Sequence, residues 1–260
     1  MSIWLTVIIL AVLQGVTEFL PVSSSGHLAV LSAVFGLSSD EGTAFSIVLH
    51  GGSLLAIVVF YFKTLLSLLQ RERIRVIGMV IIGTIPAGIA GVLIKMTGFD
   101  ELMFGDLLSI GMAFLVTASL LRLTGKEKMV RNAVTPLEKI SLKQTLIIGL
   151  SQMFAITPGI SRSGTTIAVG TFAGLNFESA AAFSFLLAIP AIGGATLLEL
   201  ISLIKSGGVI GQLSALTSFG ALTLLVAIVK KRKLSNFSWY LFLVGITVIG
   251  WQMLKLQGRG

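Results

Sequence analysis

The sequence has 260 residues, of which 55% are hydrophobic and only 12% are charged, and it contains no cysteine. Together with a mean hydropathy of +0.99, these fractions exclude an ordinary soluble domain and predict an all-α polytopic membrane protein. The lack of cysteine excludes disulfides and zinc-cysteine sites. Membrane proteins gather Lys and Arg in cytoplasmic loops, so the net charge of +8 does not indicate a nucleic-acid partner.

The chain begins with an apolar region that is interrupted in its middle. Residues 3–37 are apolar at both ends, but proline and polar residues break them at LQGVTEFLPVSSSGH, residues 13–27. Each half is too short for a comfortable membrane span, which takes about 20 residues, and is typical of a re-entrant segment. We therefore expect a helical hairpin that enters the bilayer and returns. Residues 142–175, with PGISRSGTT at 158–166, have the same character and predict a second hairpin.

Each hairpin is followed by three apolar runs that are long enough to cross a membrane. After the first hairpin these runs are 44–62, 76–94 and 107–123; after the second they are 179–204, 213–229 and 239–254. The sequence thus predicts six transmembrane helices plus two re-entrant hairpins in a single membrane domain, residues 1–260.

The two halves of the chain match when the second is shifted by 138 positions without a gap. Residues that coincide include Gln14 with Gln152, Ser23 with Ser161, Ser25 with Ser163, Gly26 with Gly164 and Gly36 with Gly174. The sequence therefore indicates an internal duplication, with repeats at about 1–124 and 140–257.

The second repeat should be inverted relative to the first, because one hairpin plus three spans crosses the membrane an odd number of times. With the N-terminus outside, the cytoplasmic loops contain most of the Lys and Arg, including the basic loop that joins the repeats, whereas the outer segments contain only Lys95, Lys205, Lys255 and Arg259. This asymmetry predicts both termini outside. Inverted repeats with broken helices form a shared polar site near the midplane, so the two polar stretches should meet.

The first polar stretch contains groups that are costly inside a membrane and are therefore candidates for function. Gln14 and Glu18 lie four residues apart on one helix face, and Pro21 is expected to end that half-helix. Ser23, Ser24 and Ser25 then supply hydroxyls at the start of the next half-helix, where unpaired N–H groups attract anions, and His27 follows within a turn. Helix capping is an alternative role for at least one of the serines.

The second polar stretch predicts an oxyanion receptor. After the break at Pro158 and Gly159, a new helix opens with Ser161, Arg162, Ser163, Gly164, Thr165 and Thr166. Arg162 offers a planar set of donors suited to phosphate oxygens, and the hydroxyls and N–H groups form a nest around them. The stretch lacks the GxxxxGK[ST] pattern of a P-loop.

QGVTEFLPVSSSGH combined with PGISRSGTT closely resembles the two signature motifs of the undecaprenyl-diphosphate phosphatase, or bacitracin-resistance, family. The resemblance extends over the whole chain. It implies a plasma-membrane hydrolase that converts undecaprenyl diphosphate to undecaprenyl phosphate and inorganic phosphate, recycling the lipid carrier of cell-wall polysaccharide synthesis. It further implies that Glu18, Ser24, His27 and Arg162 are catalytic or phosphate-binding.

The resemblance also raises the question of a divalent cation, Mg²⁺ or Ca²⁺, held by Glu18 and Gln14. Gln14 is the neutral variant of the first position in the family's (E/Q)xxxE motif, so only one carboxylate is available here. Glu18 could instead orient His27. We expect Ser24 or His27 to attack the terminal phosphorus while the other handles the proton.

A second class of function fits the same architecture. Inverted repeats with a midplane site are typical of secondary transporters, so the alternative is a lipid-phosphate flippase or anion transporter in which Arg162 binds cargo. The partners expected in either case are a prenyl diphosphate lipid and the bilayer, and a homodimer stays open. His50, beside Gly51 and Gly52 in the first long span, has no assigned role.

Overall fold

The structure is a computed structural model, and it describes residues 3–37, 39–70, 73–98, 106–130, 132–198 and 233–257. Within these ranges the chain is helical apart from turns and one isolated bridge between Thr135 and Leu175. The helices are α1 (Ile3–Thr17), α2 (Ser24–Phe35), α3 (Ser39–Phe60), α4 (Phe62–Leu68), α5 (Ile74–Thr97), α7 (Leu107–Thr124), α8 (Glu127–Val130), α9 (Leu142–Phe154), α10 (Arg162–Phe172), α11 (Phe177–Leu198) and α14 (Phe237–Gln257), with short 3-10 turns at Leu137–Lys139 and Leu234–Asn236.

The prediction of an all-helical membrane protein is confirmed. Four helices of the described residues are long and apolar enough to cross a membrane, namely α5, α7, the first part of α11 and the C-terminal helix. A fifth span is obtained if the bent pair of α3 and α4, which meet at 66° around Tyr61, counts as one. The run predicted at 213–229 lies outside the described residues.

The first half-helix of the first hairpin ends earlier than predicted. We expected Pro21 to end the first half-helix, but α1 ends at Thr17 and residues 18–22 form a turn. The second half-helix, α2, packs against α1, and the second pair of half-helices, α9 and α10, packs in the same way. Each pair is therefore a short helical hairpin. We call residues 18–27 the first polar turn and residues 158–166 the second polar turn; each includes the start of the following half-helix.

The second half-helix of each hairpin starts where the 138-residue shift predicts. Helix α10 starts 138 residues after α2, at Arg162 and Ser24 respectively. Gly36 and Gly174, which coincide under the same shift, both adopt positive φ, at 69° and 105°. Glycine tolerates this conformation without steric cost, so both residues can turn the chain out of the hairpin and into the following long helix.

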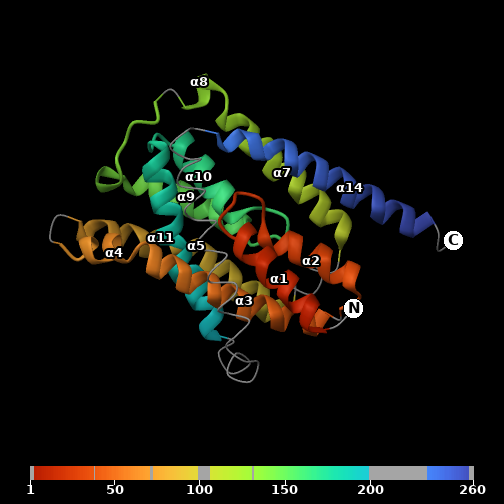
Figure 1. Cartoon of the computed structure of the whole chain (residues 1–260). Helices are drawn as coiled ribbons and strands as arrows, with labels where there is room; N and C mark the ends of the chain where they lie inside the picture. Colours follow the sequence, from red (N-terminus) through yellow and green to blue (C-terminus); the bar gives the residue numbers. More distant parts are fainter. Residues whose placement is uncertain are drawn as a thin grey trace.

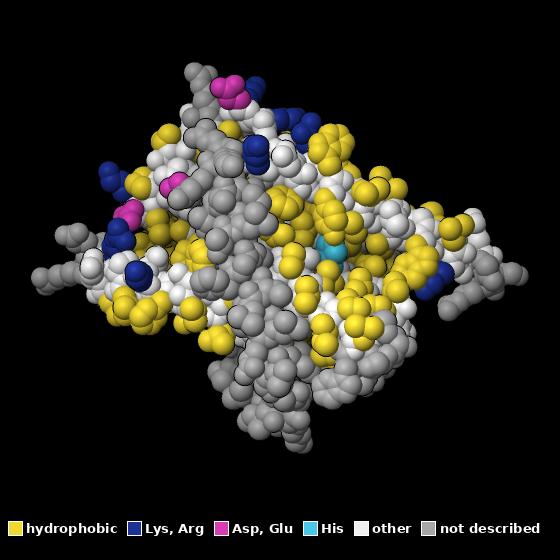
Figure 2. Space-filling model, viewed as in Figure 1, with side chains coloured by type: hydrophobic (Ala, Val, Ile, Leu, Met, Phe, Trp, Pro, Cys, Tyr) yellow, Lys and Arg dark blue, Asp and Glu magenta, His cyan; other side chains and the backbone are white. Residues whose placement is uncertain are grey.

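The hairpins lie at the centre of the arrangement (Figure 1). Helix α7 runs beside α14, and α10 packs against both α7 and α11. Figure 2 shows that hydrophobic side chains gather on the right-hand part of this face, where a histidine is visible among them, while Lys and Arg lie mainly along its upper and left margins. This distribution suits a molecule whose apolar surface faces lipid.

Candidate active site

The two polar turns touch each other through their glycines. A Cβ atom added to Gly26 would come within 2.8 Å of the Gly159 Cα, and one added to Gly164 within 3.2 Å of the Pro21 Cβ. Backbone can approach backbone this closely only where a side chain is missing. The prediction that residues 13–27 and 158–166 meet in space is therefore confirmed.

These contacts are reciprocal under the 138-residue shift. Gly26 of the first turn faces Gly159, which coincides with Pro21; Gly164, which coincides with Gly26, faces Pro21 itself. Matched positions of the two turns therefore contact each other in both directions.

The first turn is held in a strained backbone conformation. Ser23 has φ 67° and is the one non-glycine residue with positive φ among those that the structure describes. Its side chain caps α2 by accepting a hydrogen bond from the Gly26 N–H at 3.4 Å, and its hydroxyl also lies 3.4 Å from that of Ser25. Strain of this kind costs about 1–3 kcal/mol and persists where surrounding contacts impose it, often at functional sites.

The carboxylate of Glu18 is the centre of the site. Its Oε2 accepts hydrogen bonds from the Ser24 hydroxyl at 2.6 Å and from the Gln14 side-chain amide at 2.8 Å. Its Oε1 accepts from Arg162 Nη2 at 2.6 Å, across 144 residues of sequence. The Nε2 of His50 lies 3.4 Å from Oε2. One buried carboxylate therefore connects side chains of four helices, α1, α2, α3 and α10.

This carboxylate is almost inaccessible, since 5% of the Glu18 side chain and 15% of the Arg162 side chain are exposed. A buried charge is tolerated only when it is paired, and removing one partner of such a pair typically costs about 3–5 kcal/mol. The ion pair between Glu18 and Arg162 therefore keeps both charges at this depth and fixes their geometry.

The second turn uses most of its hydroxyls for its own structure. Ser161 caps α10 by accepting from the Gly164 N–H at 3.1 Å, and its own N–H donates to the Thr117 hydroxyl of α7 at 3.1 Å. The Ser163 hydroxyl lies 3.3 Å from that of Ser161, and the Thr166 hydroxyl donates to the Arg162 carbonyl at 2.8 Å. These contacts fix the N-terminal residues of α10.

Two buried donors of the second turn lack a hydrogen-bond partner within the described part of the chain. They are Nη1 of Arg162 and the hydroxyl of Thr165. Buried donors are nearly always satisfied, so two orphans beside one helix N-terminus point to a ligand that supplies acceptor oxygens. This matches the predicted oxyanion receptor in chemical type.

His27 has partners other than those expected from the sequence. Its Nδ1 lies 2.7 Å from the Ser23 carbonyl oxygen and its Nε2 lies 2.8 Å from the Tyr240 hydroxyl of α14. Ser24 instead donates its hydrogen bond to Glu18. The structure therefore has a Ser24–Glu18 pair and a His27–Tyr240 pair in place of the expected pairing of Ser24 with His27, and it does not show the alternative in which Glu18 orients His27.

The predicted residues are thus brought together, and two further residues join them. The sequence offered a weak signal for His50, which is an imidazole inside an apolar run. It offered none for Tyr240, since a tyrosine in the last apolar run is an ordinary membrane residue.

The side chains of the site could hold a cation only together with phosphate oxygens of the substrate. Among the described residues, no three His, Cys, Asp or Glu side chains gather as a metal cluster. Glu18 is the carboxylate of the site, and Oε1 of buried Gln14 is an acceptor without a partner among the described residues. Mg²⁺ commonly binds through one or two protein oxygens plus substrate phosphates, and Glu18 with Gln14 fits that mode.

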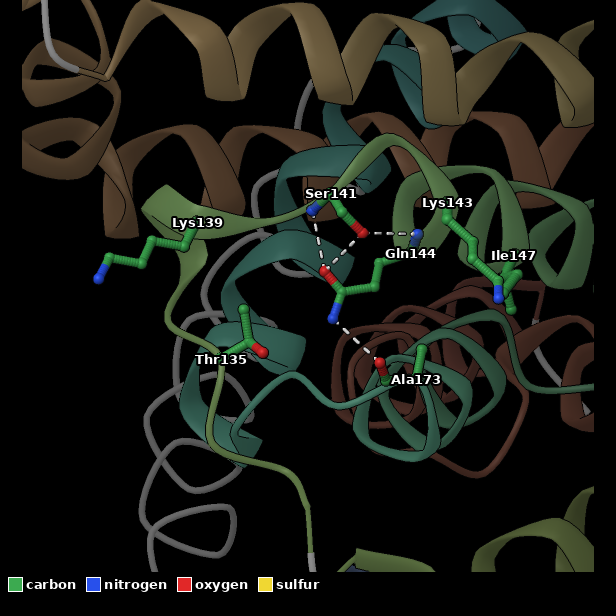
Figure 3. A pocket seen from close by; sticks show the side chains of 7 residues that line it. All are labelled: Thr135, Lys139, Ser141, Lys143, Gln144, Ile147 and Ala173. Atoms are coloured by element: carbon green, nitrogen blue, oxygen red, sulfur yellow. Dashed lines mark hydrogen bonds between the residues drawn. The ribbon is translucent and has the colours of Figure 1, made fainter.

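A cavity of about 520 Å³ at the start of α9 is the other polar candidate. It is lined by Lys139, Ser141, Lys143 and Gln144, among others. In Figure 3 the two lysine side chains point away from each other, and the Gln144 amide bridges Ser141 to the Ala173 carbonyl, donating to it at 2.9 Å. This arrangement ties α9 to the end of α10 and does not converge on an anion.

A model of the family described as bacitracin resistance protein BacA matches residues 7–247. The chain belongs to this family. The undecaprenyl-diphosphatase of Bacteroides thetaiotaomicron is 40% identical over 265 residues, covering 95% of this chain and 98% of that protein. The enzymes of the same name from Parabacteroides distasonis and Carboxydothermus hydrogenoformans are 37% and 36% identical, and cover 97% of this chain and 99% and 97% of their own lengths.

Proposed function

We propose that this family member hydrolyses undecaprenyl diphosphate to undecaprenyl phosphate and inorganic phosphate, and so recycles the lipid carrier of cell-wall polysaccharide synthesis. The observation that carries the proposal is the shared carboxylate. Ser24, a nucleophile, and Arg162, a phosphate-binding cation, bind the two oxygens of Glu18. A phosphoryl group held by Arg162 therefore lies within reach of the Ser24 hydroxyl.

Binding is assigned to the second turn. Nη1 of Arg162 and the Thr165 hydroxyl donate to the diphosphate, together with the N–H groups of Arg162 and Ser163, which no helical carbonyl can reach at a helix start. Donors fixed before the reaction stabilise the charge that the transferring phosphoryl group spreads over its oxygens. The residues proposed to bind or shape the receptor also include Ser23, Ser25, Ser161, Gly164 and Thr166.

The chemical step is assigned to the first turn. The Ser24 oxygen forms a bond to the terminal phosphorus, its proton passes to Oε2 of Glu18, and the bridging P–O bond breaks with its electron pair leaving on undecaprenyl phosphate. Water then attacks the phosphorus of the phosphoserine, the P–O bond to Ser24 breaks, inorganic phosphate leaves, and the proton held on Glu18 returns to the Ser24 oxygen. We prefer Ser24 to His27 as nucleophile because its hydroxyl already donates to a carboxylate at 2.6 Å, while both ring nitrogens of His27 have partners.

His27 is proposed to take up the proton of the attacking water at Nε2, by way of the Tyr240 hydroxyl that lies 2.8 Å from this nitrogen. Its Nδ1 faces a carbonyl oxygen, which can only accept, so the proton of neutral His27 lies on Nδ1 and the lone pair on Nε2.

A bound divalent cation, Mg²⁺ or Ca²⁺, would neutralise diphosphate oxygens and polarise the phosphorus. Glu18 and Gln14 would hold that cation.

The decisive experiment is phosphate release by the purified protein from a prenyl diphosphate, measured with and without a chelator. Release that depends on Ser24 supports the hydrolase, and loss of release on chelation supports the cation. A protein that moves the lipid across liposome membranes without hydrolysing it is instead the flippase or anion transporter that the reciprocal contact of the turns also suits.

A separate variant tests the role of Glu18. Glu18→Gln keeps an acceptor for Ser24 and Arg162 but cannot take a proton, so kcat should fall by about 10²–10⁴-fold. The matched control is Glu178→Gln, an exposed position in the first turn of α11 and away from the site, which should leave kcat unchanged. Normal turnover of Glu18→Gln contradicts the proposed proton acceptor.

We further propose that the hairpins are re-entrant, that six spans accompany them, and that the repeats are inverted in the plasma membrane with both termini outside. The reciprocal contact of the turns supports this topology. So does Figure 1, where the ends of the chain marked N and C lie toward the same side. Cysteines introduced as Gly98→Cys and Gly207→Cys should label from outside, and those from Arg73→Cys and Lys128→Cys from the cytoplasm. Labelling of positions 98 and 128 from one side contradicts the inverted repeat.

A further inference from the structure

We infer that Tyr240 is a positioning residue of the active site, which fixes the orientation of His27 and makes the C-terminal helix α14 part of the catalytic apparatus. The inference rests on the proposed hydrolysis, since it assigns a function to His27 within that reaction. The observation is the 2.8 Å contact between the Tyr240 hydroxyl and Nε2 of His27, residues 213 positions apart.

The ring of His27 is fixed on three sides. Its Nδ1 lies 2.7 Å from the Ser23 carbonyl oxygen and its Nε2 lies against Tyr240. Phe114 of α7 packs edge-on, with ring centroids 4.9 Å apart and planes at 64°. The Tyr240 ring is parallel to the imidazole, with an interplanar angle of 4°. The ring therefore has one orientation in which both nitrogens are satisfied.

A tyrosine hydroxyl can serve both protonation states of this histidine. When His27 is neutral, Nε2 has a lone pair and the Tyr240 hydroxyl donates to it. When Nε2 gains a proton, it becomes a donor and the phenol oxygen accepts. Tyr240 thus keeps His27 paired before and after a proton transfer, which a residue that only donates, such as Lys, could not do.

Exposure distinguishes the two partners. His27 is 6% exposed, whereas Tyr240 is 44% exposed. The buried imidazole is therefore connected through the phenol to the surface of the protein. A tyrosine of this kind suits a site whose apolar surroundings exclude water but whose histidine must exchange a proton.

The packing of α14 on α7 sets the position of Tyr240. A Cβ atom on Gly111 of α7 would come within 2.6 Å of the Ile249 Cγ1, and one on Gly245 of α14 within 2.9 Å of the Gly111 carbonyl oxygen. Small residues let membrane helices approach this closely. Phe114, one turn after Gly111 on the same helix, is the residue that packs on His27. Helix α7 thus positions both α14 and the imidazole.

The test compares Tyr240→Phe with the parent protein and with Tyr61→Phe, which alters the only other tyrosine of the chain. Tyr240→Phe removes the hydroxyl and keeps the ring. We expect kcat for phosphate release to fall by about 10-fold with little change in KM, because binding is assigned to the second turn and proton handling to His27. Tyr61→Phe should leave kcat unchanged.

A double-mutant cycle separates positioning from a general structural role. In a His27→Ala background, Tyr240→Phe should cause no further loss of kcat, since the hydroxyl acts through the imidazole. Full activity of Tyr240→Phe, or a loss that multiplies with that of His27→Ala, overturns the inference. An inactive parent protein would instead contradict the proposed hydrolysis.

A spectroscopic measurement tests the contact without using activity. The Tyr61→Phe chain retains one tyrosine, so a ¹³C label at the ring carbon that bears the hydroxyl reports Tyr240 alone. Adding His27→Ala should shift this resonance, because the hydroxyl loses its partner. An unchanged resonance overturns the inference even if Tyr240→Phe does not fold.

Discussion

The two polar turns both start a half-helix with a serine cap, but they differ in backbone conformation and in chemistry. The Gly26 N–H donates to Ser23 at 3.4 Å and the Gly164 N–H donates to Ser161 at 3.1 Å. The first cap has φ 67°, whereas the second has φ −74°, an ordinary extended conformation. The strained cap directly precedes Ser24, the proposed nucleophile.

Ser24 and Arg162 occupy the same position in the two copies, since each is the first residue of its helix and they are 138 residues apart. One copy has a hydroxyl where the other has a guanidinium, and both bind the same carboxylate. This difference matches the proposed division of roles, with chemistry at the first turn and anion binding at the second.

If chemistry belongs to the first turn and binding to the second, the largest expected effect is that of Ser24→Ala. Removing the nucleophile should lower kcat by about 10⁴-fold while affinity for the diphosphate persists, since binding is assigned to Arg162 and N–H groups. Turnover with and binding of a labelled prenyl diphosphate measure the two quantities. Trapping of a phosphoryl group on His27, or full activity of Ser24→Ala, would reverse the assignment.

Arg162→Lys alters the matched position of the second turn. The charge is retained, but an ammonium cannot make two fixed contacts as the guanidinium does. We expect kcat/KM to fall by about 10²–10³-fold, with a rise in KM that Ser24→Ala does not share. Steady-state kinetics over a range of substrate concentrations measures this, and near-normal turnover would show that Arg162 is not at the phosphate.

The reciprocal glycines should respond unequally to alanine. A Cβ on Gly26 meets Phe114 at 2.7 Å and backbone atoms of Gly159 at 2.8 and 2.9 Å, whereas one on Gly164 meets side-chain atoms at 3.1 and 3.2 Å. Overpacking of this kind costs about 1–3 kcal/mol, so Gly26→Ala should lower stability toward the upper end of that range and Gly164→Ala toward the lower end. Unfolding in detergent measures both.

The control for this pair is Gly88→Ala in α5, where an added Cβ meets no atom within 4 Å. Alanine favours a helix over glycine by up to about 1 kcal/mol, so this variant should be neutral or stabilised. Equal losses at Gly26 and Gly164 would contradict the tighter contact of the first turn.

The smallest effect concerns the caps themselves. Ser23→Gly relieves the positive φ, and a glycine cap costs only a few tenths of a kcal/mol, so stability should rise by about 1 kcal/mol. Ser161→Gly relieves nothing and should lower stability by a few tenths of a kcal/mol. Opposite shifts in the midpoint of unfolding are expected, and shifts of the same sign would show that Ser23 is not strained.

Much of the molecule was predictable from local sequence. The hydropathy indicated a helical membrane protein, and the breaks at residues 13–27 and 158–166 located both hairpins. Capping depends on contacts three residues along the chain, so Ser23 and Ser161 could be predicted near helix starts. The hydrogen bond between Gln14 and Glu18, four residues apart, follows from helix geometry in the same way.

The tertiary structure decided which side chains of the site contact each other. Glu18 and Ser24 are separated by a turn whose path depends on the positive φ of Ser23, and no pattern in three consecutive serines predicts that value. The contacts of Glu18 with Arg162 and of His27 with Tyr240 join residues 144 and 213 positions apart. Such pairs are set by the packing of helices, through close approaches such as Gly26 on Gly159. The sequence alone therefore predicted most residues of the candidate site but not Tyr240, while helix packing determined that the carboxylate binds the serine and that the histidine binds the C-terminal helix.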